Sequence, residues 1–291
     1  MADLHRYRSS DEDSARWAQV RLRPGDVVVS TRSKHGTTWM QTLVAMLIHG
    51  PDLPAPLAEL SPWVDFLMEP IDVVTARLDA QDHRRVLKTH TPLDGVPRID
   101  GVHYAVVARH PLDAAVSLWH QGANLDRARM AELSGSPAAR GRRPPLEDWL
   151  RRWIAADADP RTNLESLPGV IRHLTLAWSR RHDPDLVLVR YDDLRADLPG
   201  ELARLADRLG LSVRPGVAEA AGFEQMRANA DRLAPDQGGI LLDRTAFFRS
   251  GRSGDGARLL TSEEYAGYRR RVAVLAGEAG PEFLAWLHPG E

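Results

Sequence analysis

The chain has 291 residues, 43% of them hydrophobic, which is enough for one large α/β domain with a sizeable core. The formal net charge of −2 at pH 7 argues against a protein that coats nucleic acid, which would carry a basic excess. Cysteine is absent, so disulfides, thiolate metal sites and a cysteine nucleophile are excluded.

The N-terminal residues 1–19 are polar and carry charges of both signs, without the apolar core of a secretion signal. The longest apolar runs, such as residues 43–48, are too short to span a bilayer. We therefore expect a cytoplasmic protein that has no membrane partner and no nucleic-acid partner.

Short apolar, β-branched runs alternate with amphipathic runs of helical period. The former predict strands at residues 26–30, 86–89, 103–108 and 186–191. The latter predict helices at residues 38–49, 112–121, 146–155, 171–181 and 199–209. Such alternation builds a mainly parallel sheet with helices on both faces, so the predicted fold class is α/β.

No repeat or linker divides the sequence, which predicts a single domain over residues 1–291. Residues 122–145 are rich in Ala, Arg, Gly, Ser and Pro and are predicted to form a mobile surface loop. In α/β folds ligands bind beyond the carboxyl ends of the strands. This loop is therefore expected to lie near an acceptor site.

Only two lysines occur among the 38 basic residues, and each lies just after an apolar run that predicts a strand. Lys34 lies in the loop before a predicted helix, where backbone N–H groups gather and a phosphate binds well. The second strand delivers Lys88, near its end, and His90, just after it, to one loop. Because lysine is a compact point charge and arginine a fork, we interpret the two lysines as contacts to single oxygens.

The loop reads Lys34-His35-Gly36-Thr37-Thr38-Trp39, a P-loop-like but not a Walker A sequence, since its lysine precedes the glycine. Thr37 and Thr38 offer hydroxyl and backbone donors to a phosphate, and Trp39 offers a face to a purine. The same residues equally fit a capped helix with a core tryptophan.

Arg109 stands at the carboxyl end of the third strand, before a helix that begins near Pro111. There it is placed to clamp a second phosphate bidentately, with Ser117 two turns into the helix. The alternative is a surface arginine paired with Asp113.

These motifs resemble those of the cytosolic-type sulfotransferase family, whose donor is 3′-phosphoadenosine 5′-phosphosulfate (PAPS) and whose product is 3′,5′-bisphosphoadenosine (PAP). The resemblance implies that the loop from Lys34 to Trp39 holds the 5′-phosphosulfate and the adenine, and that Arg109 and Ser117 hold the 3′-phosphate. His35 replaces the usual serine. Two further matches are Tyr191-Asp192-Asp193-Leu194 and Phe223-Glu224-Gln225-Met226. The resemblance therefore implies that Tyr191 and Phe223 lie at the donor site.

The family's last motif is only partly present, as Arg249-Ser250-Gly251 after Phe248. Its glycine-rich loop is expected to wrap the 3′-phosphate with Phe248, Arg249, Ser250 and Gly251. Ser250 stands where a lysine is usual, and Arg252 is the residue expected to supply the missing charge. The motif overlaps the family's usual dimerisation segment, so the oligomeric state stays open.

The resemblance implies sulfuryl transfer from PAPS to the hydroxyl of a small-molecule acceptor. His90 is implied as general base, Lys34 as the group that stabilises the leaving phosphate, and Lys88 as a contact to the sulfuryl oxygens. Lysine and backbone donors take the place of a metal ion, so no metal is expected. Two alternatives remain, a nucleotide kinase of the P-loop class and a non-catalytic nucleotide-binding protein.

The acceptor is not defined by the sequence. Trp63, Phe66 and Trp119 are candidates to line an apolar acceptor pocket, although each equally fits an ordinary core residue. A phenol, an alcohol, a steroid and a sugar all carry a suitable hydroxyl.

Overall fold

The computed structural model describes residues 4–135 and 143–290. Its strands are β1 (Val27–Ser30), β2 (Val86–Thr89), β3 (His103–Ala108) and β4 (Leu186–Arg190). Its α-helices are α1 (Thr37–His49), α2 (Leu57–Leu60), α3 (Ile71–Asp79), α4 (Pro111–Gln121), α5 (Arg127–Ser134), α6 (Leu146–Ala155), α7 (Leu167–Ser179), α8 (Tyr191–Ala196), α9 (Leu198–Leu209), α10 (Val217–Ala220), α11 (Phe223–Ala228), α12 (Ala230–Leu233), α13 (Arg244–Phe247), α14 (Ser262–Ala276) and α15 (Gly280–Leu287). Short 3-10 helices are η1 (Ser14–Gln19), η2 (Leu93–Gly95), η3 (Ala257–Leu259) and η4 (Gly277–Ala279).

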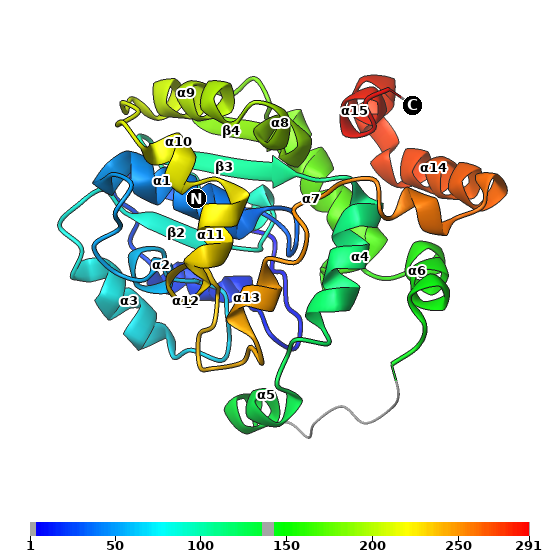
Figure 1. Cartoon of the computed structure of the whole chain (residues 1–291), viewed down its shortest axis with the longest axis horizontal. Helices are drawn as coiled ribbons and strands as arrows, with labels where there is room; N and C mark the ends of the chain where they lie inside the picture. Colours follow the sequence, from blue (N-terminus) through cyan, green and yellow to red (C-terminus); the bar gives the residue numbers. More distant parts are fainter. Residues whose placement is uncertain (1–3, 136–142, 291) are drawn as a thin grey trace.

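The described strands form one parallel sheet in the order β2-β1-β3-β4, with helices on both of its faces (Figure 1). Successive side chains of a strand point to opposite faces. Val27 and Val29 accordingly pack into a core with α1 and α9, whereas Val28 packs into a core with η1 and α3. The predicted α/β fold with a parallel sheet is confirmed.

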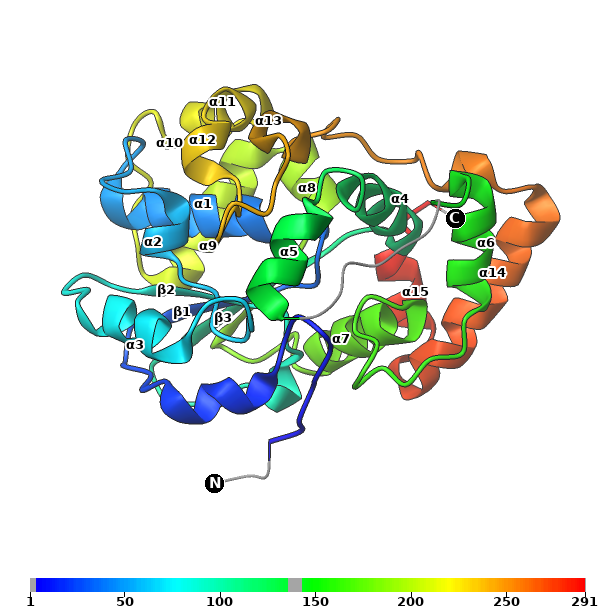
Figure 2. The same ribbon diagram turned by 90° about the horizontal axis from the view of Figure 1, so that it is seen from below.

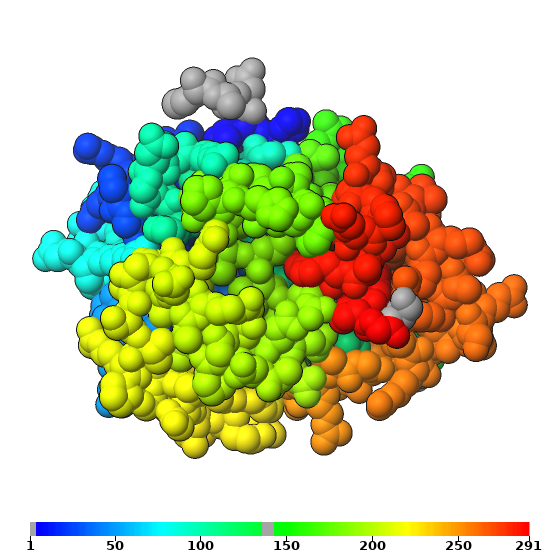
Figure 3. Space-filling model, turned by 90° about the horizontal axis from the view of Figure 1, so that it is seen from above, coloured from blue at the N-terminus to red at the C-terminus, as the bar shows by residue number. Residues whose placement is uncertain are grey.

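A third apolar core lies beside the sheet and joins α4, α6, α7, α14 and α15. Figure 2 shows these helices gathered at one end of the molecule. In the space-filling view, the C-terminal helices, in orange and red, pack along one side of the green central segment (Figure 3). The C-terminal helices thus extend the fold beside the sheet, and their core includes Ala108, the last residue of β3.

Three predictions of local structure need correction, and several described helices, among them α3, α14 and α15, were not predicted. Tyr191 begins α8 and does not end a strand, and α7 begins at Leu167, where the Ser166 hydroxyl accepts a hydrogen bond from Gly169 N–H at 3.1 Å. Within the predicted loop 122–145, Asp126 caps helix α5 by accepting hydrogen bonds from two backbone N–H groups. That prediction is wrong for α5, and residues 136–142 lie outside the described residues.

The strand register brings the motif residues to one edge of the sheet. Ser30 pairs with Thr89, and β3 lies on the other side of β1, so the segments that follow β1, β2 and β3 meet there. Residues 62–66 run along the outer side of β2, with Lys88 N–H bonded to the Pro62 carbonyl at 2.9 Å. This added segment places Trp63 and Phe66 next to the same edge.

Candidate functional site

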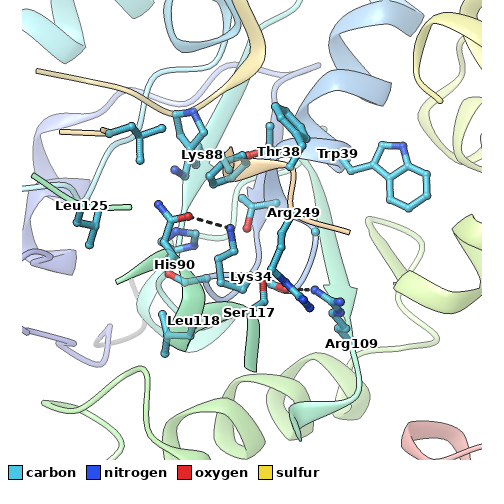
Figure 4. A pocket seen from close by; sticks show the side chains of 18 of the residues that line it. Lys34, Thr38, Trp39, Lys88, His90, Arg109, Ser117, Leu118, Leu125 and Arg249 are labelled. Atoms are coloured by element: carbon cyan, nitrogen blue, oxygen red, sulfur yellow. Dashed lines mark hydrogen bonds between the residues drawn. The ribbon is translucent and has the colours of Figure 1, made fainter. Parts of the chain in front are cut away.

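A cavity of about 270 Å³ opens at this edge of the sheet. Figure 4 shows Lys34 near its centre, with His90, Leu118 and Leu125 on one side and Arg109 and Arg249 on the other. The residues predicted from the sequence that line it are Lys34, Gly36, Thr37, Thr38, Trp39, Trp63, Phe66, Lys88, His90, Arg109, Ser117, Tyr191, Phe223, Phe248, Arg249, Ser250 and Gly251.

The loop between β1 and α1 has the geometry of an anion-binding turn. Lys34 has φ of 65° and Gly36 has φ of 112°, both in the left-handed region. A Cβ atom on Gly36 would lie 3.0 Å from the Tyr191 ring, so only glycine fits there without strain. The first N–H groups of α1 have no partner within the helix and carry the positive end of its dipole. This arrangement suits a phosphate.

In the cavity wall Lys88 is buried and Lys34 is partly buried, and neither has a carboxylate partner at salt-bridge distance among the described residues. The Lys34 Nζ atom donates to Gln121 Oε1 at 3.3 Å and lies 3.7 Å from the Phe247 ring centroid. The Lys88 Nζ atom lies 3.4 Å from the Trp63 ring centroid. Burial lowers the pKa of each lysine to about 7, and the positive charge of Arg109 adds to the effect at Lys34. An anion bound between them would restore their charge.

His90 is held in one tautomer and one orientation. Its Nδ1–H group donates to the carbonyl oxygen of Thr31, which leaves the lone pair on Nε2. The Trp63 ring meets the imidazole edge-on at 4.6 Å between centroids. Burial, followed by the charges of Lys88 and Arg32, lowers the pKa of His90 well below its ordinary value. The imidazole is therefore neutral near pH 7, the form that accepts a proton.

Asp65 supports this histidine, and sequence reasoning missed it. Its buried Oδ2 atom accepts hydrogen bonds from the His90 N–H at 3.2 Å and from the Thr91 N–H and hydroxyl at 3.1 Å and 2.6 Å. The Thr89 hydroxyl donates to the same oxygen. A carboxylate inside the apolar run of residues 61–68 was the signal that could have revealed it.

Arg109 joins the loop before α1 to the C-terminal glycine-rich loop. Its guanidinium donates to the Lys34 carbonyl at 3.1 Å and to the Arg252 carbonyl at 2.8 Å, and lies 4.5 Å from the Tyr191 ring centroid. The alternative pairing with Asp113 is wrong, because both oxygens of that carboxylate accept backbone N–H groups of the glycine-rich loop. The positive charge of Arg109 is thus presented to the cavity.

Arg249 supplies a second positive charge on this side of the cavity. It donates to Asp255 at 2.9 Å, while its buried Nε atom has no hydrogen-bond partner. Arg252, expected to supply the charge missing from the last motif, does not line the cavity and is exposed. Arg109, Arg249 and Ser117 therefore form the polar part of this side.

Aromatic rings close the cavity between α1 and α11. The Trp39 indole N–H donates to the Ala221 carbonyl at 2.9 Å, and its ring meets Tyr191 edge-on at 5.3 Å. Gly251 has φ of 60°, and a Cβ atom there would lie 2.8 Å from the Phe223 ring. These rings offer flat apolar faces to a planar ligand.

Two predicted site residues do not line the cavity. His35 is buried beneath the loop, where its Nδ1 atom contacts the Ser33 carbonyl at 3.0 Å. Trp119 faces away, with its indole N–H bonded to the Pro144 carbonyl at 3.3 Å and the Arg143 guanidinium 3.9 Å from its ring centroid. Helix α4 instead presents to the cavity Leu118 and Gln121, which lie one and two positions from Trp119 in the sequence.

Apolar side chains gather at the end of the cavity beyond His90, although Asp11, Glu12 and Glu165 also line the cavity. Trp63 and Phe66 stack with centroids 4.2 Å apart and planes at 7°. Leu125, Met130 and Ile240, which the sequence did not single out, pack with these two rings and also line the cavity. An apolar acceptor would fit this end, whereas the charged end fits an anion.

Metal-ligating side chains do not gather in groups of three or more anywhere in the described part of the chain. Among the described helices, none is long and apolar enough to cross a membrane.

Comparison with known proteins gives a consistent result. A family profile described as "Sulfotransferase domain" matches residues 24–271. A protein of Mycobacterium tuberculosis named glycolipid sulfotransferase is 40% identical over 316 residues, covering 100% of this chain and 96% of the relative. Sulfotransferase 1A1 of Canis lupus familiaris is 25% identical over 250 residues, covering 80% of this chain and 77% of the relative.

Two solved structures share the fold. Retinol dehydratase in complex with retinol and PAP gives a TM-score of 0.71 at 23% identity, covering 91% of this chain and 85% of that one. A mouse sulfotransferase complexed with PAP gives a TM-score of 0.67 at 17% identity, covering 94% of this chain and 90% of that one.

Proposed function

Since the chain belongs to the sulfotransferase family and is an enzyme of that class, we propose a specific reaction for it. It transfers a sulfuryl group from PAPS to a hydroxyl of an amphipathic acceptor such as a glycolipid. The single observation that carries the proposal is the order of groups in one cavity. Positive charge lies at one end, His90 and the two lysines lie in the middle, and apolar side chains lie at the other end.

The charged end is proposed to bind the donor. The loop before α1, with Lys34, would hold the 5′-phosphosulfate, and Arg109, Ser117 and Arg249 would hold the 3′-phosphate. Trp39 and Phe223 offer their faces to the adenine. The residues fit a bisphosphorylated nucleotide because two groups of cationic and backbone donors face one cavity. The bound forms of the structural neighbours carry PAP, which supports the same nucleotide here.

In the proposed reaction the acceptor oxygen attacks the sulfur while the bond from sulfur to the bridging phosphate oxygen breaks. Nε2 of His90 takes the hydroxyl proton, because Nδ1 is occupied by Thr31. Lys34 stabilises the negative charge that develops on the leaving phosphate, and Lys88 contacts the sulfuryl oxygens. Positioning and charge thus carry the catalysis, as in phosphoryl transfer.

The acceptor is proposed to be amphipathic because the end of the cavity beyond His90 is lined by large apolar side chains. The relative named glycolipid sulfotransferase, which the chain matches over its full length, supports the same class. A kinase would instead need a loop that wraps consecutive phosphates, and a non-catalytic protein would not need a neutral, oriented His90.

The test combines turnover with ligand binding. Sulfated product is expected from labelled PAPS and a glycolipid. PAP at a hundred times its dissociation constant should add about 2.7 kcal/mol to the free energy of unfolding. Stabilisation by MgATP with no effect of PAP would favour the kinase, and PAP binding without product from any hydroxyl acceptor would favour the non-catalytic protein.

A further inference from the structure

A second cavity, of about 310 Å³, adjoins the first and shares Asp11, Glu12 and Glu165 with it. We infer that this second cavity is a subsite for the polyhydroxyl headgroup of the acceptor, and that it favours a neutral or cationic headgroup over an anionic one. The inference rests on the proposed function, because it assigns the acceptor of that same site.

The second cavity meets the first beside the acceptor wall, because Glu12 lines both cavities and its backbone pairs with Phe66. Arg109 and Arg249, which belong to the proposed donor end, line only the first cavity. An acceptor bound in the first cavity therefore contacts residues that also line the second, on a side away from the proposed donor end.

The lining of the second cavity is polar, in contrast to the apolar acceptor end of the first. Eight of its residues carry polar side chains and one, Leu164, does not; the polar ones are Ser9, Ser10, Asp11, Glu12, Arg32, Thr162, Asn163 and Glu165. Hydroxyl, amide and carboxyl groups are the partners that sugar hydroxyls need, since each sugar hydroxyl both donates and accepts. Such a lining would leave an apolar ligand facing unpaired polar groups.

A buried charge network gives this wall a fixed shape. Arg32 is 1% exposed, and it pairs with Glu12 at 3.3 Å and with Glu165 at 2.6 Å. Glu12 is itself buried, and its backbone pairs with Phe66 across a β-bridge that ties the N-terminal segment to the acceptor wall. The two ion pairs of Arg32 hold the side chains of Glu12 and Glu165 in place, so a headgroup meets preorganised partners.

Charge sets the class of headgroup. Three carboxyl groups and one guanidinium line the second cavity, and Arg32 pairs with two of the carboxyls, Glu12 and Glu165. Burial raises the pKa of Glu12 to about 8, so Glu12 adds little negative charge near pH 7. An added sulfate or carboxylate would meet the remaining excess of carboxyl groups, Asp11 and Glu165 against Arg32, in a partly enclosed site, whereas neutral hydroxyls would find acceptors. Together the two cavities fit a neutral glycolipid, with its tail on Leu125 and Ile240 and its sugar beside Asn163.

The experiment measures acceptor binding by calorimetry, with and without PAP, using octyl glucoside, octyl glucuronide and octanol below their limits of self-association. In the wild-type protein the glucoside is expected to bind about tenfold more tightly than either of the other two ligands. Octanol lacks the sugar hydroxyls and so loses about one net hydrogen bond, and the carboxylate of the glucuronide is repelled. Equal affinity for glucoside and octanol would overturn the inference.

Variants locate the effect. Ser10→Leu and Asn163→Leu put apolar bulk on residues that line only the second cavity, and each is expected to weaken glucoside binding about tenfold relative to octanol. Ser212→Leu is the matched control, because Ser212 is exposed like Ser10 but lies in the loop after α9. Equal weakening for glucoside and octanol would mean a general structural role and would refute the subsite.

The same proteins are then assayed with labelled PAPS, and the ratio of kcat/KM for glucoside to octanol should fall in the same two variants. If the wild-type protein sulfates no acceptor, the proposed function fails while the calorimetric ratio still decides the subsite. If it sulfates both acceptors with equal kcat/KM, the proposed function stands and the headgroup subsite fails.

Discussion

The Nδ1–H group of His90 donates to the carbonyl oxygen of Thr31, the residue that follows β1. The hydroxyl oxygen of Thr31 accepts a hydrogen bond from the Val107 N–H at 3.0 Å, which anchors Thr31 to β3. One residue thus connects the proposed general base, the phosphate-binding loop and the sheet. The orientation of His90 is therefore tied to the loop that is proposed to hold the donor.

Replacing His90 with Ala is expected to lower kcat about 10²- to 10⁴-fold, because a general base contributes that much to proton transfer. PAP affinity should change little, since the imidazole is not placed at the donor end. The check is a single-turnover measurement beside a PAP titration. A variant that keeps more than about a third of the wild-type rate when chemistry is limiting would contradict the assignment.

The pH dependence of PAP binding should follow the two lysines. Burial lowers their pKa values to about 7, so in the free protein each loses its proton as pH rises through that value. Bound PAP favours the charged form, and binding should therefore take up protons. Affinity is expected to fall from about pH 7 to about pH 9, by at most about tenfold per pH unit for each lysine.

Calorimetry in buffers of different ionisation enthalpy measures this proton uptake. Lys34→Arg is the informative variant, since arginine stays charged throughout and should remove the contribution of Lys34 to the pH dependence. Its turnover should stay below that of the wild-type protein, because a fork does not reproduce a point charge. Two results would count against the role of Lys34. One is wild-type kinetics in the Lys34→Arg variant, and the other is a PAP affinity of the wild-type protein that does not change with pH.

Arg109→Ala is expected to discriminate between nucleotides. Loss of a charge-assisted contact of roughly 1.5–3 kcal/mol should weaken PAP binding about 10- to 150-fold. Adenosine 5′-phosphate, which lacks the 3′-phosphate, should bind almost equally to both proteins. Arg252→Ala is the control, because its carbonyl still accepts from Arg109 while its exposed side chain is lost. An equal loss for both nucleotides would assign Arg109 to the loop structure instead.

Gly36→Ala should destabilise the protein more than Ala does at a glycine that has a left-handed φ but open space around it. Ala at φ of 112° is strained, and its Cβ atom would lie 3.0 Å from the Tyr191 ring. Gly210→Ala is the matched control, since that glycine has φ of 63° and nothing within 4 Å of the added atom. The control should cost about 1–2 kcal/mol.

Gly36→Ala should exceed this cost and also weaken PAP binding, whereas Gly210→Ala should leave PAP binding unchanged. Thermal unfolding with and without PAP measures both effects. Equal destabilisation by the two substitutions would show that the Tyr191 contact is not restrictive.

The sequence by itself determined the elements of the sheet and the place of the motifs. Apolar runs bounded by polar residues predicted all four described strands, because period and composition report burial directly. Lys34, Lys88 and Arg109 were found because each lies near the carboxyl end of a strand, and parallel strands end at one edge of the sheet.

Only the tertiary structure decided which side chains face the cavity. Trp119 and Leu118 are neighbours on α4, and the rotation of the helix, which depends on its packing against α6, turns one away and the other inward. Asp65 and Glu12 act through hydrogen bonds to segments distant in the chain, which no local pattern encodes. The second cavity arises where residues 9–12 meet residues 162–165. Such contacts depend on how the packed elements are placed in space, and local propensity carries no information about that placement.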